Sequence, residues 1–229
     1  MKTKGFFRIL ILLVISVMIF TGCSQEEKSD PVQFDTNTNY RIARINIRDY
    51  GSVLFRLYSK EEPEAVEKFI ELCRSGYYDG KSFFGIIEDY LVIGGEKDAL
   101  DKNLLKVSGK NDDMYPYRGA LCLSFTAEDE VSLSEFYVIT LKSEKISDIE
   151  ELVENKGYTL SDYIKFGYKT ELTADELDQY RLYGGAPWLY GHTLVFGQAY
   201  EGLDILDQIM TDKLSDDQLE VFIDSIETN

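Results

Sequence analysis

Short apolar segments separated by turn residues run along most of this chain, and they constrain its fold more than any other feature. Residues 42–47 and 53–58 alternate apolar and polar side chains around a turn at residues 49–51, which predicts a β-hairpin. Further strands are expected over residues 82–87, 90–93, 119–125, 135–140, 194–199 and 219–226. So many antiparallel strands with few helices favour a mainly β fold, a closed or nearly closed barrel of about eight strands.

Two helices and one helical region interrupt these strands. The first helix is expected over residues 63–73, because Pro63 suits a first helical turn and Gly76 follows its end. The second is expected over residues 202–210. Three shorter helices, over residues 146–155, 160–165 and 173–183, gather between residues 141 and 187. That region is therefore interpreted as a helical insertion into a single barrel domain of residues 40–229.

The first residues are typical of a targeting segment. Positive side chains within the first eight residues precede an apolar run over residues 9–20, which is shorter than the roughly 20 residues that cross a bilayer. Thr21-Gly22-Cys23 follows directly and resembles the bacterial lipobox. The resemblance implies that residues 1–22 are a lipoprotein signal peptide and that Cys23 becomes the lipidated first residue. An ordinary signal peptide with an incidental cysteine is the alternative.

Residues 23–39 are polar after the cysteine and are interpreted as a flexible linker between the lipid and the domain. The expected location is therefore extracytoplasmic, at the cell membrane. Removal of residues 1–22 would change the formal net charge from −17 to −20, since that segment carries three positive charges and no acidic residue. So acidic a chain argues against nucleic acid as a partner, because phosphates would be repelled.

The remaining cysteines and the single histidine restrict the chemistry. Cys73 and Cys122 both lie among apolar residues, which favours buried core thiols over a disulfide. His192 is the only histidine, which argues against a histidine-based metal site. No metal and no cofactor are expected.

Several motifs, in their order along the chain, resemble the cyclophilins. Gly76-Tyr77-Tyr78-Asp79-Gly80 resembles the family's G-Y-Y-D-G, and Phe83 follows at the family's spacing. The other matching segments are residues 86–87, 90–95, 118–121, 134–138, 188–191, 195–198 and 201–209. The resemblance covers nearly all of residues 42–226. It implies a cyclophilin-like closed antiparallel β-barrel capped by two helices, and peptidyl-prolyl cis-trans isomerase activity.

The position that supplies the family's catalytic donor differs here. Rotation about the bond before proline has a barrier of about 20 kcal/mol, and cyclophilins lower it with an apolar pocket and an arginine that donates a hydrogen bond. The family motif F-H-R corresponds to Phe83-Phe84-Gly85 in this chain, so Gly85 occupies the arginine position. Ile93 replaces a family glutamine. Neither residue has a side chain that can donate a hydrogen bond.

The family's pocket walls are better preserved, since Tyr90, Leu91, Tyr137 and Leu189 fall on its Phe, Met, Phe and Leu positions and Trp188 falls on its tryptophan. The remaining positions differ. Glu135 replaces a glutamine, Ser124 an alanine, and the second histidine aligns with Thr193, or with His192 after a slip of one residue. The residues that the resemblance assigns to substrate binding are Phe83, Tyr90, Leu91, Ile93, Ser124, Glu135, Tyr137, Trp188, Leu189 and His192. Plain barrel packing is the alternative role for the apolar members. Arg56 and Arg118 are candidate replacement donors.

Three functional hypotheses remain from the sequence. The first is a peptidyl-prolyl isomerase that acts on proline-containing segments of exported proteins. The second, which Gly85 and Ile93 favour, is a non-catalytic peptide- or protein-binding module at the membrane surface. The third is a lipoprotein whose helical insertion binds a partner while the barrel serves as its support. A cyclophilin-type lipoprotein with weak or lost catalysis combines the first two.

Overall fold

The computed structural model describes residues 32–34, 40–107, 113–126, 130–216 and 218–229. The chain divides into two compact units, residues 1–32 and 33–229, and the elements described below belong to the second, apart from Val32 at its border. The predicted signal peptide, Cys23 and most of the predicted linker lie outside the described residues. No helix within the described ranges is both long and apolar enough to cross a membrane.

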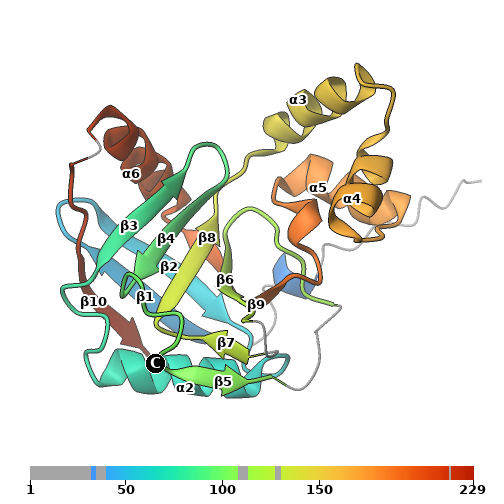
Figure 1. Cartoon of the computed structure of the whole chain (residues 1–229). Coiled ribbons are helices and arrows are strands. Elements are labelled where there is room, and N and C mark those ends of the chain that lie inside the picture. Colours follow the sequence, from blue (N-terminus) through green and yellow to red (C-terminus); the bar gives the residue numbers. More distant parts are fainter. Residues whose placement is uncertain (1–31, 35–39, 108–112, 127–129, 217) are drawn as a thin grey trace, which may run out of the picture. The chain divides into compact units, whose positions relative to one another are not determined.

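Eight antiparallel strands form one sheet in the order β10-β1-β2-β9-β6-β8-β4-β3 (Figure 1). The strands are β1 (Arg41–Ile47), β2 (Gly51–Leu57), β3 (Ser82–Ile87), β4 (Leu91–Gly95), β6 (Ala120–Ser124), β8 (Glu135–Ile139), β9 (Thr193–Glu201) and β10 (Ile223–Thr228). The two ends of the sheet meet, because the Phe83 amide donates to the Val221 carbonyl at 2.8 Å and the Ile223 amide to the Lys81 carbonyl at 2.7 Å. The predicted closed barrel is confirmed.

The helices fall into the two expected groups. Helices α2 (Pro63–Arg74) and α6 (Leu203–Ser215) pack on the barrel, while α3 (Ser143–Glu154), α4 (Leu160–Tyr168) and α5 (Ala174–Tyr183) gather beside it as the insertion (Figure 1). Capping boxes begin two insertion helices: Thr159 pairs with Asp162 at α4, and Thr173 pairs with Glu176 at α5. Each box satisfies backbone amides that the first helical turn leaves without partners.

Some boundaries differ from those expected. The last strand begins at Ile223 rather than residue 219, because residues 221 and 222 instead bond to the start of β3 and close the barrel. Helix α6 continues to Ser215, since no glycine or proline interrupts it after residue 210. A second sheet of β5 (Leu104–Lys106) and β7 (Glu130–Ser132) was not predicted, because three-residue strands carry too little alternation.

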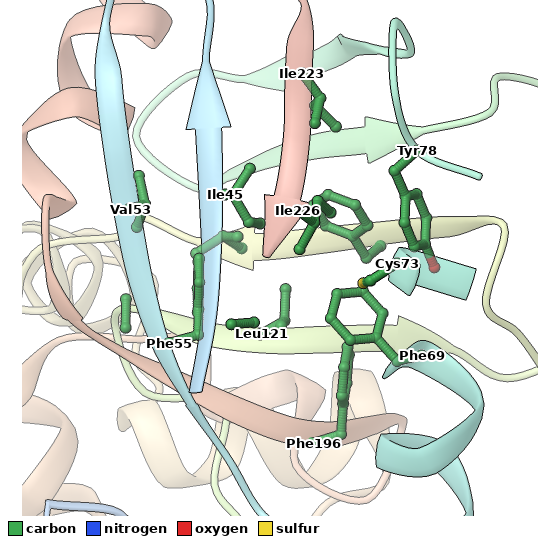
Figure 2. Close-up of a cluster of buried hydrophobic side chains, with 14 of the residues drawn as sticks. Ile45, Val53, Phe55, Phe69, Cys73, Tyr78, Leu121, Phe196, Ile223 and Ile226 are labelled. Atoms are coloured by element: carbon green, nitrogen blue, oxygen red, sulfur yellow. The ribbon is translucent and has the colours of Figure 1, made fainter. Parts of the chain in front are cut away.

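The barrel interior is filled by aliphatic and aromatic side chains. Figure 2 shows Phe55, Leu121 and Phe196 from the strands meeting Phe69 and Cys73 from α2. Cys73 and Cys122 are both buried and free, as the sequence predicted. Burial raises the pKa of each thiol well above its usual value, so both thiols stay protonated.

Strands β4, β6, β8 and β9 are buried on both of their faces. Their inner-face residues belong to the barrel core, whereas the alternate residues belong to a second cluster that the insertion covers. We call this second group the outer-face cluster. Its strand residues are Leu91, Ile93, Ala120, Cys122, Tyr137, Ile139 and Val195. Insertion residues such as Ile146, Val153 and Ile164 complete it.

Candidate functional site

Most of the predicted pocket residues meet in the outer-face cluster. Leu91 and Tyr137 are buried there, and Tyr90, Trp188 and Leu189 pack against them with partial exposure, as does Ile93. They come from β4, from the turn before it, from β8 and from the 3₁₀ helix η2 (Pro187–Leu189). Segments almost 100 residues apart in sequence thus form one apolar wall on the outside of the barrel.

Phe83 does not join this wall. Its side chain is 1% exposed and lies in the barrel interior, with its ring centroid 6.1 Å from that of Phe136. The alternation of β3 explains the placement, since Phe83 points inward. Phe83 can therefore support the site only through the packing of the barrel.

A buried hydrogen-bond chain occupies the back of the wall. The Tyr137 hydroxyl donates to Thr193 Oγ1, which in turn donates to the Leu123 carbonyl at 2.8 Å. Burial raises the pKa of Tyr137 well above its usual value, with Cys122 adding to the rise and hydrogen bonding to Thr193 opposing it. Tyr137 is therefore neutral at physiological pH. Its hydroxyl projects beyond the ring that a phenylalanine would place there.

Trp188 and Tyr90 form the exposed edge of the wall. The Trp188 indole N–H donates to the Tyr90 hydroxyl at 2.9 Å, and the two ring centroids are 5.7 Å apart. Partial burial raises the pKa of Tyr90, and the Trp188 hydrogen bond opposes that rise. Both rings keep partial exposure, so an incoming peptide can stack on them.

Gly85 and Ile93 face each other across β3 and β4. They are paired in the strand register, and a Cβ atom added to Gly85 would lie 2.9 Å from Ile93 Cδ1 and 3.1 Å from Ile93 Cβ. Gly85 is not among the glycines with a positive φ, so its backbone conformation does not require glycine. Only the Ile93 side chain limits the size of a side chain at this position. The Ile93 side chain thus lies where the first atoms of a side chain at residue 85 would have to be.

Three other predicted positions are engaged in local contacts. Ser124 pairs with Thr193 in the strand register and lies beside the Tyr137 hydroxyl. The Glu135 carboxylate accepts a hydrogen bond from the Ala99 amide at 2.7 Å, which ties the segment after β4 to β8. His192 is exposed, with Nε2 2.9 Å from the Tyr168 carbonyl of α4. Thr193, not His192, therefore faces the Tyr137 hydroxyl.

The two candidate replacement arginines have other partners. Arg118 Nη2 lies 2.8 Å from Asp207 of α6, and its Nε donates to the Thr140 carbonyl at 3.3 Å. The Arg56 guanidinium lies 4.8 Å from the ring centroid of Tyr200.

Two contributors to the site were missed from the sequence: Cys122 is a buried neighbour of Tyr137, and Tyr168 packs its ring 6.2 Å from Trp188. Thr193, which the resemblance aligned with the family's second histidine, accepts the hydrogen bond from the Tyr137 hydroxyl. The apolar runs Leu121-Cys122-Leu123 and Phe136-Tyr137-Val138 carry a usable signal, since continuous apolar strands are buried on both faces. No such local signal exists for Tyr168, whose contact depends on how the insertion packs.

The arrangement can bind a peptide through apolar and aromatic contact. It presents one pair of exposed rings and a buried wall. No arginine or glutamine side chain stands at the two positions where the family supplies its donor and that donor's neighbour. Among the described residues, no three histidine, cysteine, aspartate or glutamate side chains come together as metal ligands.

Comparison with known sequences indicates the same family as the motifs described above. The profile of the cyclophilin type peptidyl-prolyl cis-trans isomerase/CLD family matches residues 42–228. A predicted peptidyl-prolyl cis-trans isomerase of Staphylococcus saprophyticus is 27% identical over 205 residues, which covers 85% of this chain and 96% of the relative. A predicted isomerase of Staphylococcus haemolyticus is 28% identical over 170 residues, which covers 72% of this chain and 78% of the relative.

Solved structures show the same fold. The crystal structure of a cyclophilin type peptidyl-prolyl cis-trans isomerase from Cryptosporidium parvum superposes with a TM-score of 0.52 at 20% sequence identity, and covers 83% of this chain and 98% of that structure. The fold and outer-face site define a cyclophilin-like barrel. With the family profile spanning most of its length, this chain belongs to the cyclophilin type peptidyl-prolyl cis-trans isomerase family.

Proposed function

We propose that this protein is an exported, lipid-anchored member of the family that binds proline-containing segments of exported proteins with weak or no isomerase activity. The observation that supports a loss of catalysis is the pairing of Gly85 with Ile93 across β3 and β4. A Cβ at residue 85 would lie 2.9 Å from Ile93 Cδ1, so two substitutions together remove the donor and fill its place. The retained wall around Leu91 and Tyr137 supports peptide binding.

The isomerisation rate of a proline peptide tests this proposal directly. The purified protein is expected to show little acceleration, because Gly85 and Ile93 supply no side-chain donor for the amide whose resonance must be broken. The double variant Gly85→Arg/Ile93→Gln restores both family residues, and it is expected to raise the rate at least roughly tenfold over the unchanged protein. A rate near that of an ordinary cyclophilin in the unchanged protein would refute the loss of catalysis.

The single variant Gly85→Arg is the matched control for the double variant. Its new Cβ meets the intact Ile93 side chain, so the strands must separate and the thermal midpoint is expected to fall. It should gain little activity, since the arginine cannot adopt its position beside Ile93. Equal gains in the single and double variants would show that Ile93 does not obstruct the site.

The proposed anchor has its own test. Mass spectrometry of the mature protein should find Cys23 as an acylated N-terminal residue, and Cys23→Ala should release the protein from membranes. Stable anchoring takes more than one acyl chain, which a diacylglycerol-modified cysteine supplies. An unmodified N-terminus at another residue would refute the anchor and leave the peptide-binding proposal standing.

A further inference from the structure

An apolar groove lies between the helical insertion and Trp188, at the edge of the predicted peptide site. It has a volume of about 390 Å³, within the roughly 300–1,000 Å³ typical of ligand pockets. Its apolar lining includes Ile149, Leu152, Tyr158, Tyr163, Tyr168 and Trp188. Lys156 is the single charged residue of the lining. We call this the insertion groove.

Several large, mainly apolar side chains of the insertion groove are exposed to solvent. Leu152 is 56% exposed, Tyr158 55% and Tyr163 39%, although each is a residue that burial would stabilise. They come from the end of α3, from the loop after it and from α4, which lie together beside the barrel in Figure 1. Clustered exposed apolar side chains of this kind mark binding surfaces.

The insertion groove adjoins the peptide site. A second groove, which Tyr90 helps to line, shares Ile149, Leu152 and Trp188 with it. Trp188 stands at the junction, with its indole N–H on Tyr90 and its ring beside Tyr168. An extended chain held at Tyr90 can therefore run past Trp188 onto the insertion.

The connecting groove is acidic. Glu88, Asp89 and Asp148 line it, whereas Lys145 is its single basic residue. Lys145 Nζ lies 2.9 Å from Asp89 and 3.8 Å from Asp148, so one cation is shared between two carboxylates and the groove keeps a net negative charge. A basic residue in the bound chain would complement it.

We propose that the insertion groove is a second subsite for the same peptide segment. It takes a bulky apolar side chain, best an aromatic one, that flanks the proline, and the acidic connecting groove favours a basic residue between the two. This inference rests on the proposed peptide binding and names its substrate class. A second copy of the chain is a poorer occupant, because two molecules with a formal charge of −17 each repel one another.

The test measures peptide binding to the purified full chain by fluorescence anisotropy. The reference peptide is Ala-Ala-Pro-Ala-Ala with alanine extensions, and the probes carry one phenylalanine at successive positions on either side of the proline. At the best position, phenylalanine should tighten binding at least about tenfold, as burial of its ring in an apolar groove predicts. A lysine between phenylalanine and proline should tighten it further, an effect that rising salt should weaken.

Two matched variants assign that preference to the insertion groove. Tyr158→Glu places a charge on its wall at an exposed loop position that the connecting groove does not share, and should abolish the phenylalanine preference while leaving the reference peptide bound as before. Leu182→Glu is the control, since Leu182 of α5 is 65% exposed and lines neither groove. It should keep the full preference. Asp148→Asn should reduce only the contribution of lysine.

Four results would overturn the inference. Equal binding of the phenylalanine and reference peptides would remove the subsite but leave the proposed function intact. Equal binding when alanine replaces the proline would show that the insertion groove acts apart from the peptide site. Self-association that Tyr158→Glu disrupts would make a second copy the occupant. Failure to bind any proline peptide would refute the proposed function together with this extension of it.

Discussion

The two faces of strands β4, β6, β8 and β9 differ in chemistry although both are buried. The inner face contributes Phe136, Phe196 and other hydrophobic side chains to the barrel core. The outer face places a thiol and two hydroxyl groups, those of Cys122, Tyr137 and Thr193, within the same apolar setting. The difference indicates that the inner face serves packing, while the outer face also holds a buried hydrogen-bond chain.

The largest effect is expected on the inner face. Phe136→Ala should lower the free energy of unfolding by about 3–5 kcal/mol, since it leaves a cavity among three aromatic neighbours, Phe69, Tyr78 and Phe83. Urea unfolding followed by circular dichroism measures this loss. A loss below about 1 kcal/mol would mean that the barrel interior relaxes around the cavity.

On the outer face, loss of a hydrogen bond in the buried chain should lower the free energy of unfolding more than a small change in side-chain volume. Thr193→Val should cost about 1–3 kcal/mol, because it leaves the buried Tyr137 hydroxyl and the Leu123 carbonyl without their partner. Tyr137→Phe should cost only about 1 kcal/mol, as Thr193 keeps its bond to Leu123. The same unfolding experiment compares them, and a larger loss for Tyr137→Phe would contradict this order.

The exposed edge of the outer face should affect binding more than stability. Trp188→Phe removes the N–H that holds Tyr90, so the affinity for a proline peptide should fall about fivefold with little change in unfolding. Tyr90→Phe removes the other half of the same bond. The two changes together should cost about as much as either alone in a titration; additive losses would show that the residues act independently.

The smallest effect is expected beyond both faces, at the half-buried Glu96 that follows β4. Hydrogen bonds from Lys102, Lys81 and Tyr77 lower the pKa of Glu96 to about 2, from an ordinary 4.5. A lowered pKa means that the carboxylate stabilises the fold above pH 4.5, and that this contribution is lost as the pH falls toward 2. Glu96→Gln should therefore flatten the decline in thermal midpoint between about pH 5 and 2. An unchanged decline would show that other carboxylates cause it.

The short linker segment in the described structure adds a point that composition did not predict. Gln33 is fully buried, with its amide donating to the Tyr115 carbonyl at 2.8 Å and accepting from the Tyr115 amide at 2.7 Å. Phe34 stacks on Tyr183 of α5, with ring centroids 4.4 Å apart. These two residues of the predicted linker therefore belong to the folded unit.

Much of the fold could be predicted because its signals are local. The alternation over residues 42–47 and 53–58 produced a hairpin close to the observed β1 and β2, and Pro63 began α2 as expected. The site could be predicted only in part. Tyr90, Leu91, Tyr137 and Trp188 meet as the family resemblance implied, whereas Phe83 turned inward with the alternation of β3.

The sequence alone determined the strand periods, the helix starts, the burial of the cysteines and the replacement of the donor by Gly85. These follow from side-chain type and spacing, which act over a few residues. The tertiary structure decided three other features. These are the strand register that pairs Gly85 with Ile93, the hydrogen-bond partner of the Tyr137 hydroxyl, and the groove beside Trp188. Each depends on strands and helices far apart in the chain, whose pairing follows from packing the whole domain rather than from any local pattern.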